Sequence, residues 1–122
     1  MNLNEYQEKA MRTCLHDSNN FAYMMLNLVA EVGEFSGKIA KAIRGGQLNM
    51  IDMQLRQGKE GIPASMAALS IELKKEAGDI LWQIAGLCHV FNWDLEEVAK
   101  LNINKLQKRK DEDKIQGSGD NR

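Results

Sequence analysis

The sequence predicts an all-α protein, built as a four-helix-bundle-like subunit that we expect to be oligomeric. The 122-residue chain contains a single proline, so little interrupts helix formation. Apolar residues recur at steps of three and four over two long stretches, which is the spacing of one helix face in a bundle. Strand-like alternation is almost absent. Because two long apolar seams exceed what so few helices can cover, they favour partner helices from other copies.

Length and composition indicate one globular domain. A chain of 122 residues with 43% apolar and 27% charged residues can form a core but has no room for a second domain. The net charge of −1, from 16 basic and 17 acidic residues, gives no reason to expect a nucleic acid or an acidic membrane as partner. We assign residues 1–110 to the domain and expect the polar residues 111–122 to form a disordered tail.

The chain is also predicted to be cytoplasmic. No stretch approaches the roughly 20 apolar residues of a membrane span. Cys14 and Cys88 match no metal-binding spacing, so we expect reduced core thiols. Several early side chains are polar where a signal peptide needs an apolar run: Asn2, Asn4, Glu5 and Gln7.

The first helix is predicted from about residue 3 to about residue 16. Asn2 is a good N-cap, and Glu5 completes a capping-box pattern. After a polar turn, the second helix is predicted over residues 20–44, ending at two glycines. Its seam comprises Phe21, Met25, Leu28, Val32, Phe35, Ile39 and Ala42.

Residues 45–64 fit a short strand, a short helix or an ordered loop, and the sequence does not choose among them. The third helix is predicted over residues 65–91. The fourth begins after Asp94, a fitting N-cap with Glu97 in capping-box position, and continues to about residue 110. One stripe of this helix becomes polar and basic toward its end: Leu95, Val98, Asn102, Lys105 and Arg109.

Two acidic pairs beside the apolar seams are the candidate functional residues. Glu31 and Glu34 stand three residues apart on the second helix, and Glu76 and Asp79 do so on the third. Residues three apart lie on one helix face. Carboxylates converging from two helices cannot all stay ionised in a half-buried groove without a cation. Oxygen-only ligands suit Mg²⁺ or Mn²⁺ rather than zinc, and two such ions can clamp a polyphosphate.

The acidic pairs have a second interpretation, which periodicity alone leaves equally open. They fit exposed faces paired with lysines: Lys38, Lys41, Lys74 and Lys75. Gly33 and Gly78, inside the two motifs, each lower helix propensity by about 1 kcal/mol. Close approach of the two helices would explain these glycines, with or without a metal.

The stripe of Asn102, Lys105 and Arg109 suits phosphate oxygens, because Lys and Arg donate hydrogen bonds while carrying positive charge. An amphipathic helix whose basic side chains extend into solvent explains the same pattern.

The sequence resembles the MazG-like all-α nucleoside triphosphate pyrophosphohydrolases. The resemblance rests on the segments Leu28–Phe35, Glu76–Trp82 and Leu95–Asn102 with the basic residues that follow. It implies hydrolysis of (d)NTPs between the α and β phosphates. By similarity, the carboxylates Glu31, Glu34, Glu76 and Asp79 would bind Mg²⁺.

The resemblance also implies individual roles and an assembly. Glu34 and Glu76 would be the catalytic carboxylates, with Glu34 orienting the attacking water. Asn102, Lys105 and Arg109 would contact the phosphates. The family's sites form between subunits, so a homodimer or homotetramer is implied.

The connection between Glu34 and Glu76 is longer than is usual for the family, and the extra residues 46–64 fit a lid, a base-specificity element or an oligomer contact. Two alternatives remain open at this stage. One is a non-catalytic helical interaction protein, and the other is a related dUTP- or phosphoribosyl-ATP-type hydrolase. The sequence does not identify the base or the sugar.

Overall fold

The computed structural model describes residues 1–51, 54–57 and 66–120. It confirms the all-α class and adds one small hairpin of strands. The elements in chain order are α1 (Leu3–Met11), a 3₁₀ turn (His16–Ser18), α2 (Phe21–Arg44), β1 (Leu48–Ile51), β2 (Gln54–Gln57), α3 (Met66–Val90) and α4 (Leu95–Asp111).

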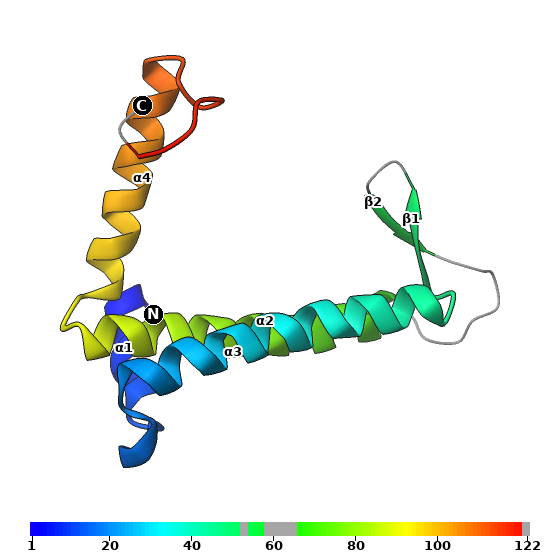
Figure 1. Ribbon diagram of the computed structural model, residues 1–122, viewed down its shortest axis with the longest axis horizontal. Coiled ribbons are helices and arrows are strands. Elements are labelled where there is room, and N and C mark those ends of the chain that lie inside the picture. The colour runs from blue at the N-terminus through cyan, green and yellow to red at the C-terminus, as the bar shows by residue number, and fades with distance from the viewer. Residues whose placement is uncertain (52–53, 58–65, 121–122) are drawn as a thin grey trace.

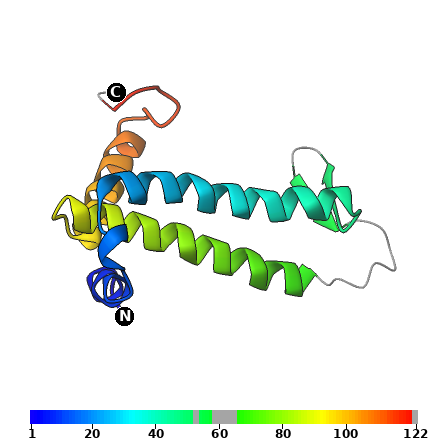
Figure 2. The ribbon, with the colours of Figure 1, turned by 60° about the horizontal axis from the view of Figure 1, so that its bottom comes forward.

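Helices α2 and α3 form a long antiparallel pair, which gives the molecule its horizontal arm (Figures 1 and 2). Helix α1 packs on α3 near the end of the pair where α2 begins. Helix α4 packs on α1 and projects away from the pair, so one copy has the outline of an L (Figure 1). Within one copy, the faces of α2 and α4 that point away from their packing partners are therefore not covered by other helices.

Helix α1 begins as predicted but ends earlier. The Asn2 side chain accepts from the Glu5 amide, and the Glu5 carboxylate accepts from the Asn2 amide, which is the predicted capping box. The helix stops at Met11, so its predicted extension to about residue 16 is wrong. The Trp82 indole N–H donates to the carbonyl of Ala10 at 3.1 Å and to the Thr13 hydroxyl at 2.9 Å. This contact from α3 engages the carbonyl that the next helical turn would use.

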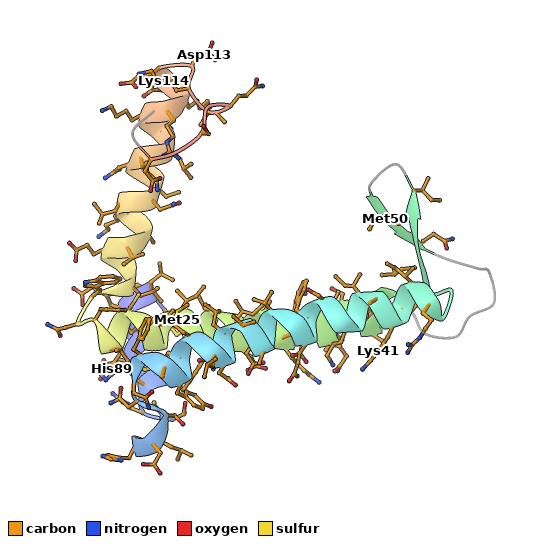
Figure 3. All side chains as sticks on the ribbon, in the orientation of Figure 1. Met25, Lys41, Met50, His89, Asp113 and Lys114 are labelled. Atoms are coloured by element: carbon orange, nitrogen blue, oxygen red, sulfur yellow. The ribbon has the colours of Figure 1, made fainter. Side chains whose placement is uncertain are left out.

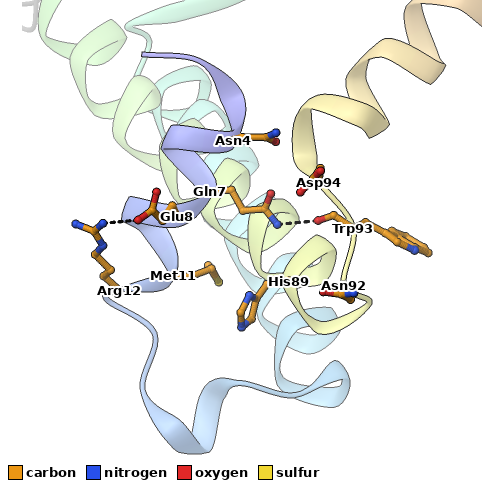
Figure 4. A pocket seen from close by; sticks show the side chains of 9 residues that line it. All are labelled: Asn4, Gln7, Glu8, Met11, Arg12, His89, Asn92, Trp93 and Asp94. Carbon is orange, nitrogen blue, oxygen red and sulfur yellow. Dashed lines mark hydrogen bonds and ion pairs between the residues drawn. The ribbon is translucent and has the colours of Figure 1, made fainter.

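Helix α4 begins where predicted, and Asp94 is its N-cap residue. The Asp94 side chain makes no capping hydrogen bond. The free amides of α4 donate instead to side chains of α1: Leu95 to Gln7 Oε1 at 2.8 Å and Glu96 to Asn4 Oδ1 at 3.0 Å. Gln7 also donates to the carbonyl of Trp93 (Figure 4). Helix α1 therefore satisfies the start of α4, a role usually taken by a residue beside the helix.

The core lies where α1, α3 and α4 meet. Ala85, Cys88 and Leu95 are buried there, with partly buried neighbours packed around them: Leu3, Tyr6, Met11 and Val98. Both cysteines are free thiols, and only Cys88 is fully buried.

Between α2 and α3, the fully buried Met24 packs directly against Gly86. A methyl group at Gly86 would collide with the Met24 thioether, so this glycine permits the close approach of the two helices. The predicted seam of α2 is only partly covered, because Phe21 and Val32 remain 52% and 46% exposed.

The segment that the sequence left open contains an antiparallel hairpin, in which Leu48 pairs with Gln57 and Ile51 with Gln54. Leu48 is buried and packs this hairpin onto the α2 side of the molecule. Residues 52–53 and 58–65 of this segment lie outside the described residues.

Residues 112–120 follow α4 as turns, and Asp120 contacts α4 again. The predicted division into a domain over 1–110 and a disordered tail over 111–122 stays a prediction. Over the described residues, no helix is both long and apolar enough to cross a membrane. The cytoplasmic location stays a prediction as well.

Candidate metal centre

The centre of the α2–α3 pair brings three of the four predicted carboxylates together. Glu31 and Glu34 come from α2 and Glu76 from α3, and one oxygen of each lies within 4.8 Å of the others. Burial differs among the three: Glu76 is buried, Glu31 is half-buried and Glu34 is exposed. The carboxylate of Glu76 thus forms the floor of the cluster, and that of Glu34 faces solvent.

Asp79 lies outside this three-carboxylate cluster. It is exposed, but it is near enough to influence two neighbours. Its charge contributes to raising the pKa of Glu31 and, after burial, that of Tyr6. Asp79 therefore lies near Glu31 and Tyr6 but does not join the three clustered carboxylates.

Glu31 experiences the repulsion that the sequence predicts. Burial is the main cause that raises its pKa, and the charges of Asp79, Glu34 and Glu76 act in the same direction. The Asn27 amide opposes this shift by donating to Glu31 Oε1 at 2.9 Å. Ionised Glu31 is thus disfavoured in the folded chain, and a nearby cation would relieve that cost.

Lys38 is the cation that contacts the cluster in the described chain. Its Nζ lies 3.2 Å from Glu76 Oε1 and 3.4 Å from Glu72 Oε2. Hydrogen bonds to Glu76 and then to Glu72 raise the pKa of Lys38. The sequence suggested Lys38 only as a partner of exposed acids, and its contact with the buried Glu76 was missed. A signal existed, because Lys38 follows Glu34 by four residues and so lies on the same face.

The other lysines of the alternative interpretation are less involved. Lys75 pairs with Glu72 at 2.7 Å, one turn before Glu76. Lys41 and Lys74 form no ion pair with another residue in the described ranges. The structure therefore combines features of both interpretations of the acidic pairs. Three carboxylates form a cluster, as a metal site would need, and one lysine forms an ion pair at its edge.

The donor set fits a hard divalent cation. Mg²⁺ binds oxygen at about 2.1 Å, so two ligands of one ion stand at most about 4.2 Å apart. A spread of up to 4.8 Å needs only small side-chain rotations to reach that geometry. Glu34 also borders an open groove of about 390 Å³, whose other lining residues are Ala30, Gly33, Gly37, Lys38 and Lys41. The groove provides space for a ligand beside the exposed carboxylate.

Gly33 and Gly78 do not mark a close approach of helices within one copy. A Cβ at either position would meet nothing within 4 Å. The prediction that helix packing explains them is wrong for the single chain, because both glycines lie on its exposed faces.

The predicted phosphate-binding residues lie on α4, apart from the carboxylates. Arg109 is buried and donates to Asp120 Oδ1 at 3.0 Å and to the carbonyl of Gly119 at 3.1 Å. Lys105 also bonds Asp120 Oδ1, at 3.2 Å. Asn102 lines an apolar cavity of about 630 Å³ with Trp93, Glu97, Val98, Leu101 and Lys105. Sequence reasoning missed Asp120, since no local pattern connects it to α4.

The MazG nucleotide pyrophosphohydrolase domain matches residues 19–112, which include every carboxylate of the cluster and the basic stripe of α4. The chain belongs to the MazG nucleotide pyrophosphohydrolase family. A curated relative is the Gene 37 protein of Mycobacterium phage L5, which is 33% identical over 129 residues and is matched over the full length of both chains. No solved structure matches the chain. Membership in the MazG family confirms the resemblance that the acidic segments suggested.

Proposed function

We propose that the protein hydrolyses (d)NTPs between the α and β phosphates, giving nucleoside monophosphate and pyrophosphate, with Mg²⁺ as cofactor. The observation that carries the proposal is the convergence of Glu31, Glu34 and Glu76 within 4.8 Å in a chain of the MazG family. Mn²⁺ has similar ligand preferences and is expected to substitute.

In the proposed site, Glu31, Glu34, Glu76 and Asp79 would hold the cation. When bound, the cation would draw charge from phosphate oxygens and lower the pKa of a nearby water. Glu34, whose side chain is exposed, would orient the attacking water and accept its proton. The water oxygen would bond to the α-phosphorus while the α–β anhydride bond breaks and pyrophosphate leaves.

Phosphate contacts are proposed for Asn102, Lys105 and Arg109. Because α4 projects away from the α2–α3 pair (Figure 1), we propose that a second copy supplies these residues. Large apolar side chains left open on both helices support such an assembly, as a homodimer or homotetramer. They include Leu26 and Val29 on α2, 75% and 69% exposed, and Leu101 and Ile103 on α4, each 63% exposed.

The direct test is pyrophosphate release from all eight common NTPs and dNTPs, with Mg²⁺ and with EDTA. Metal-dependent release of pyrophosphate and monophosphate from one or a few substrates would support the proposal and identify the base. Adding dUTP and phosphoribosyl-ATP to the panel separates the related hydrolases that the sequence left open. If folded protein that binds the metal releases no pyrophosphate from any of these nucleotides, the proposed hydrolysis is contradicted.

The exposed apolar faces also favour a second function, a helical interaction protein without catalysis. Thermal unfolding distinguishes the two. A ligand that binds the folded state raises the melting temperature, so a rise with Mg²⁺ or Mn²⁺ favours the enzyme, and complete indifference favours the interaction protein.

A further inference from the structure

Lys38 joins the two helices of the carboxylate cluster. Two ion pairs between described residues connect α2 to α3. Both are formed by the ammonium group of Lys38, one with Glu76 and one with Glu72. The Lys38 side chain is 33% exposed and that of Glu76 only 11% exposed. Contacts to a nearly buried carboxylate are screened less than surface pairs.

The position of Lys38 is that of a counterion to the carboxylate cluster rather than that of an ordinary surface ion pair. Glu76 is the innermost of the three clustered carboxylates, and Glu31 and Glu34 repel it from α2. Lys38 comes from the same helix as these two, one turn after Glu34, and puts a positive charge beside Glu76. Without this charge, the cluster would hold only negative groups in contact with one another.

We propose that Lys38 is a positioning residue that stabilises the metal-free cluster through Glu76 and thereby lowers the affinity of the cluster for a divalent cation. The inference rests on the proposed metal-binding role of Glu76. Its basis is charge: a fixed ammonium group beside the ligand repels an incoming cation, while it also offsets the repulsion among the carboxylates when no cation is bound. Lys38 also pairs with Glu72, and the negative charge of Glu72 weakens the effect of the Lys38 charge at Glu76.

The experiment compares Mn²⁺ affinity and metal-free melting temperature in the full-length chain. Lys38→Met keeps helix propensity and side-chain length while removing the charge. We expect Mn²⁺ to bind about tenfold more tightly, because a positive charge beside the ligands is removed, while the metal-free melting temperature falls. Electron paramagnetic resonance of free Mn²⁺ measures the affinity without any nucleotide.

Three further variants test the cause. Lys38→Arg keeps the charge and should therefore bind Mn²⁺ with the affinity of the wild-type protein. Lys41→Met removes the same charge from the same groove, but Lys41 pairs with no described residue, so it should leave both readouts nearly unchanged. Glu72→Gln leaves Lys38 to Glu76 alone and should weaken Mn²⁺ binding, the opposite of Lys38→Met.

The outcomes separate this inference from the proposed function. Wild-type protein that binds no Mn²⁺ or Mg²⁺ would overturn the proposed function and, with it, the inference. Wild-type protein that binds metal, with Lys38→Met binding no more tightly, would overturn the inference alone. A lower melting temperature with unchanged Mn²⁺ affinity would identify Lys38 as a purely structural bridge and would also overturn it.

Discussion

The carboxylate cluster of α2 and α3 and the basic end of α4 differ in how their charges are balanced. In the cluster, three acidic side chains lie within 4.8 Å of one another, and Lys38 alone among the described cations contacts them. On α4, Lys105 and Arg109 share one carboxylate, Asp120, from the same chain. The first region has excess negative charge, whereas in the second one carboxylate offsets half of the positive charge of Lys105 and Arg109.

This contrast indicates that a single copy holds the acidic half of the proposed site ready for a cation, but not the basic half ready for a phosphate. The acidic half is held by two packed helices and has a charge excess that a cation would offset. The basic half lies on a helix that leaves this pair, and residues after α4 bond its side chains. In Figure 3, Asp113 and Lys114 label the start of this C-terminal segment, far from the α2–α3 pair. In the proposed site, a second copy would supply the basic half, and Asp120 would release Lys105 and Arg109.

The largest expected effect comes from removing the innermost charge of the acidic half. Glu76→Gln should reduce pyrophosphate release at least about a hundredfold, because it removes a proposed metal ligand while keeping side-chain shape. Circular dichroism should show unchanged helix content. Loss of helix together with activity would instead indicate a structural carboxylate.

The second prediction concerns the division of the site between copies. Glu76→Gln and Lys105→Gln should each be nearly inactive alone, yet random mixing should restore about a quarter of wild-type activity. Half of the dimers are then mixed, and one of the two sites in each mixed dimer carries neither substitution. No recovery from subunits shown to exchange would place both groups in the site of one copy.

A substitution at Glu31 is expected to have a moderate effect, in which the metal-free protein becomes more stable while metal binding becomes weaker. Its pKa is raised, mainly by burial, so the stability present below the usual carboxyl range is lost as the pH rises through that raised pKa. Glu31→Gln should therefore raise the metal-free melting temperature by a few degrees at neutral pH and flatten its pH dependence, while weakening Mn²⁺ binding. The amide oxygen can still accept from Asn27, which controls for that hydrogen bond.

The smallest expected effect concerns Asp120. Asp120→Asn should free Lys105 and Arg109 and lower the KM for nucleotide by up to about fivefold, the range of an exposed ion pair. Hydrogen bonds from Lys105 and then Arg109 lower the pKa of Asp120. The ion pair is therefore intact at neutral pH and is lost only as the pH falls through the lowered pKa. An unchanged KM in this variant, with Glu112→Gln as a neighbouring control, would show that Asp120 does not compete with phosphate.

Local signals predicted which acidic side chains of α2 and α3 come together, while their role as metal ligands stays a prediction. Glu31, Glu34 and Glu76 could be identified because helical spacing places such residues beside an apolar seam, and the seam determines how two helices face each other. Asp79 was grouped with them by the same spacing, but the structure leaves it outside the three-carboxylate cluster. Spacing along one helix does not determine how far a side chain reaches across to the next.

Long-range contacts account for what the sequence did not predict. Asp94 matched the local pattern of an N-cap, yet Gln7, from a distant part of the chain, accepts the hydrogen bond expected of its side chain. Helix α1 ended early because Trp82 engages the Ala10 carbonyl. Gly33 and Gly78 suggested close packing that occurs instead at Gly86. Each of these outcomes depends on a tertiary partner that no window of sequence contains.

The hydrogen bonds from α4 to Gln7 and Asn4 have a consequence for the order of folding. A ribosome makes α1 first, but the amides of Leu95 and Glu96, which donate to side chains of α1, emerge 88 and 92 residues after their partners. Until then α1, nine residues long, is too short to be stable by itself. Contacts of such sequence separation slow folding, so the corner of the L should be completed last, after the α2–α3 hairpin has formed during synthesis.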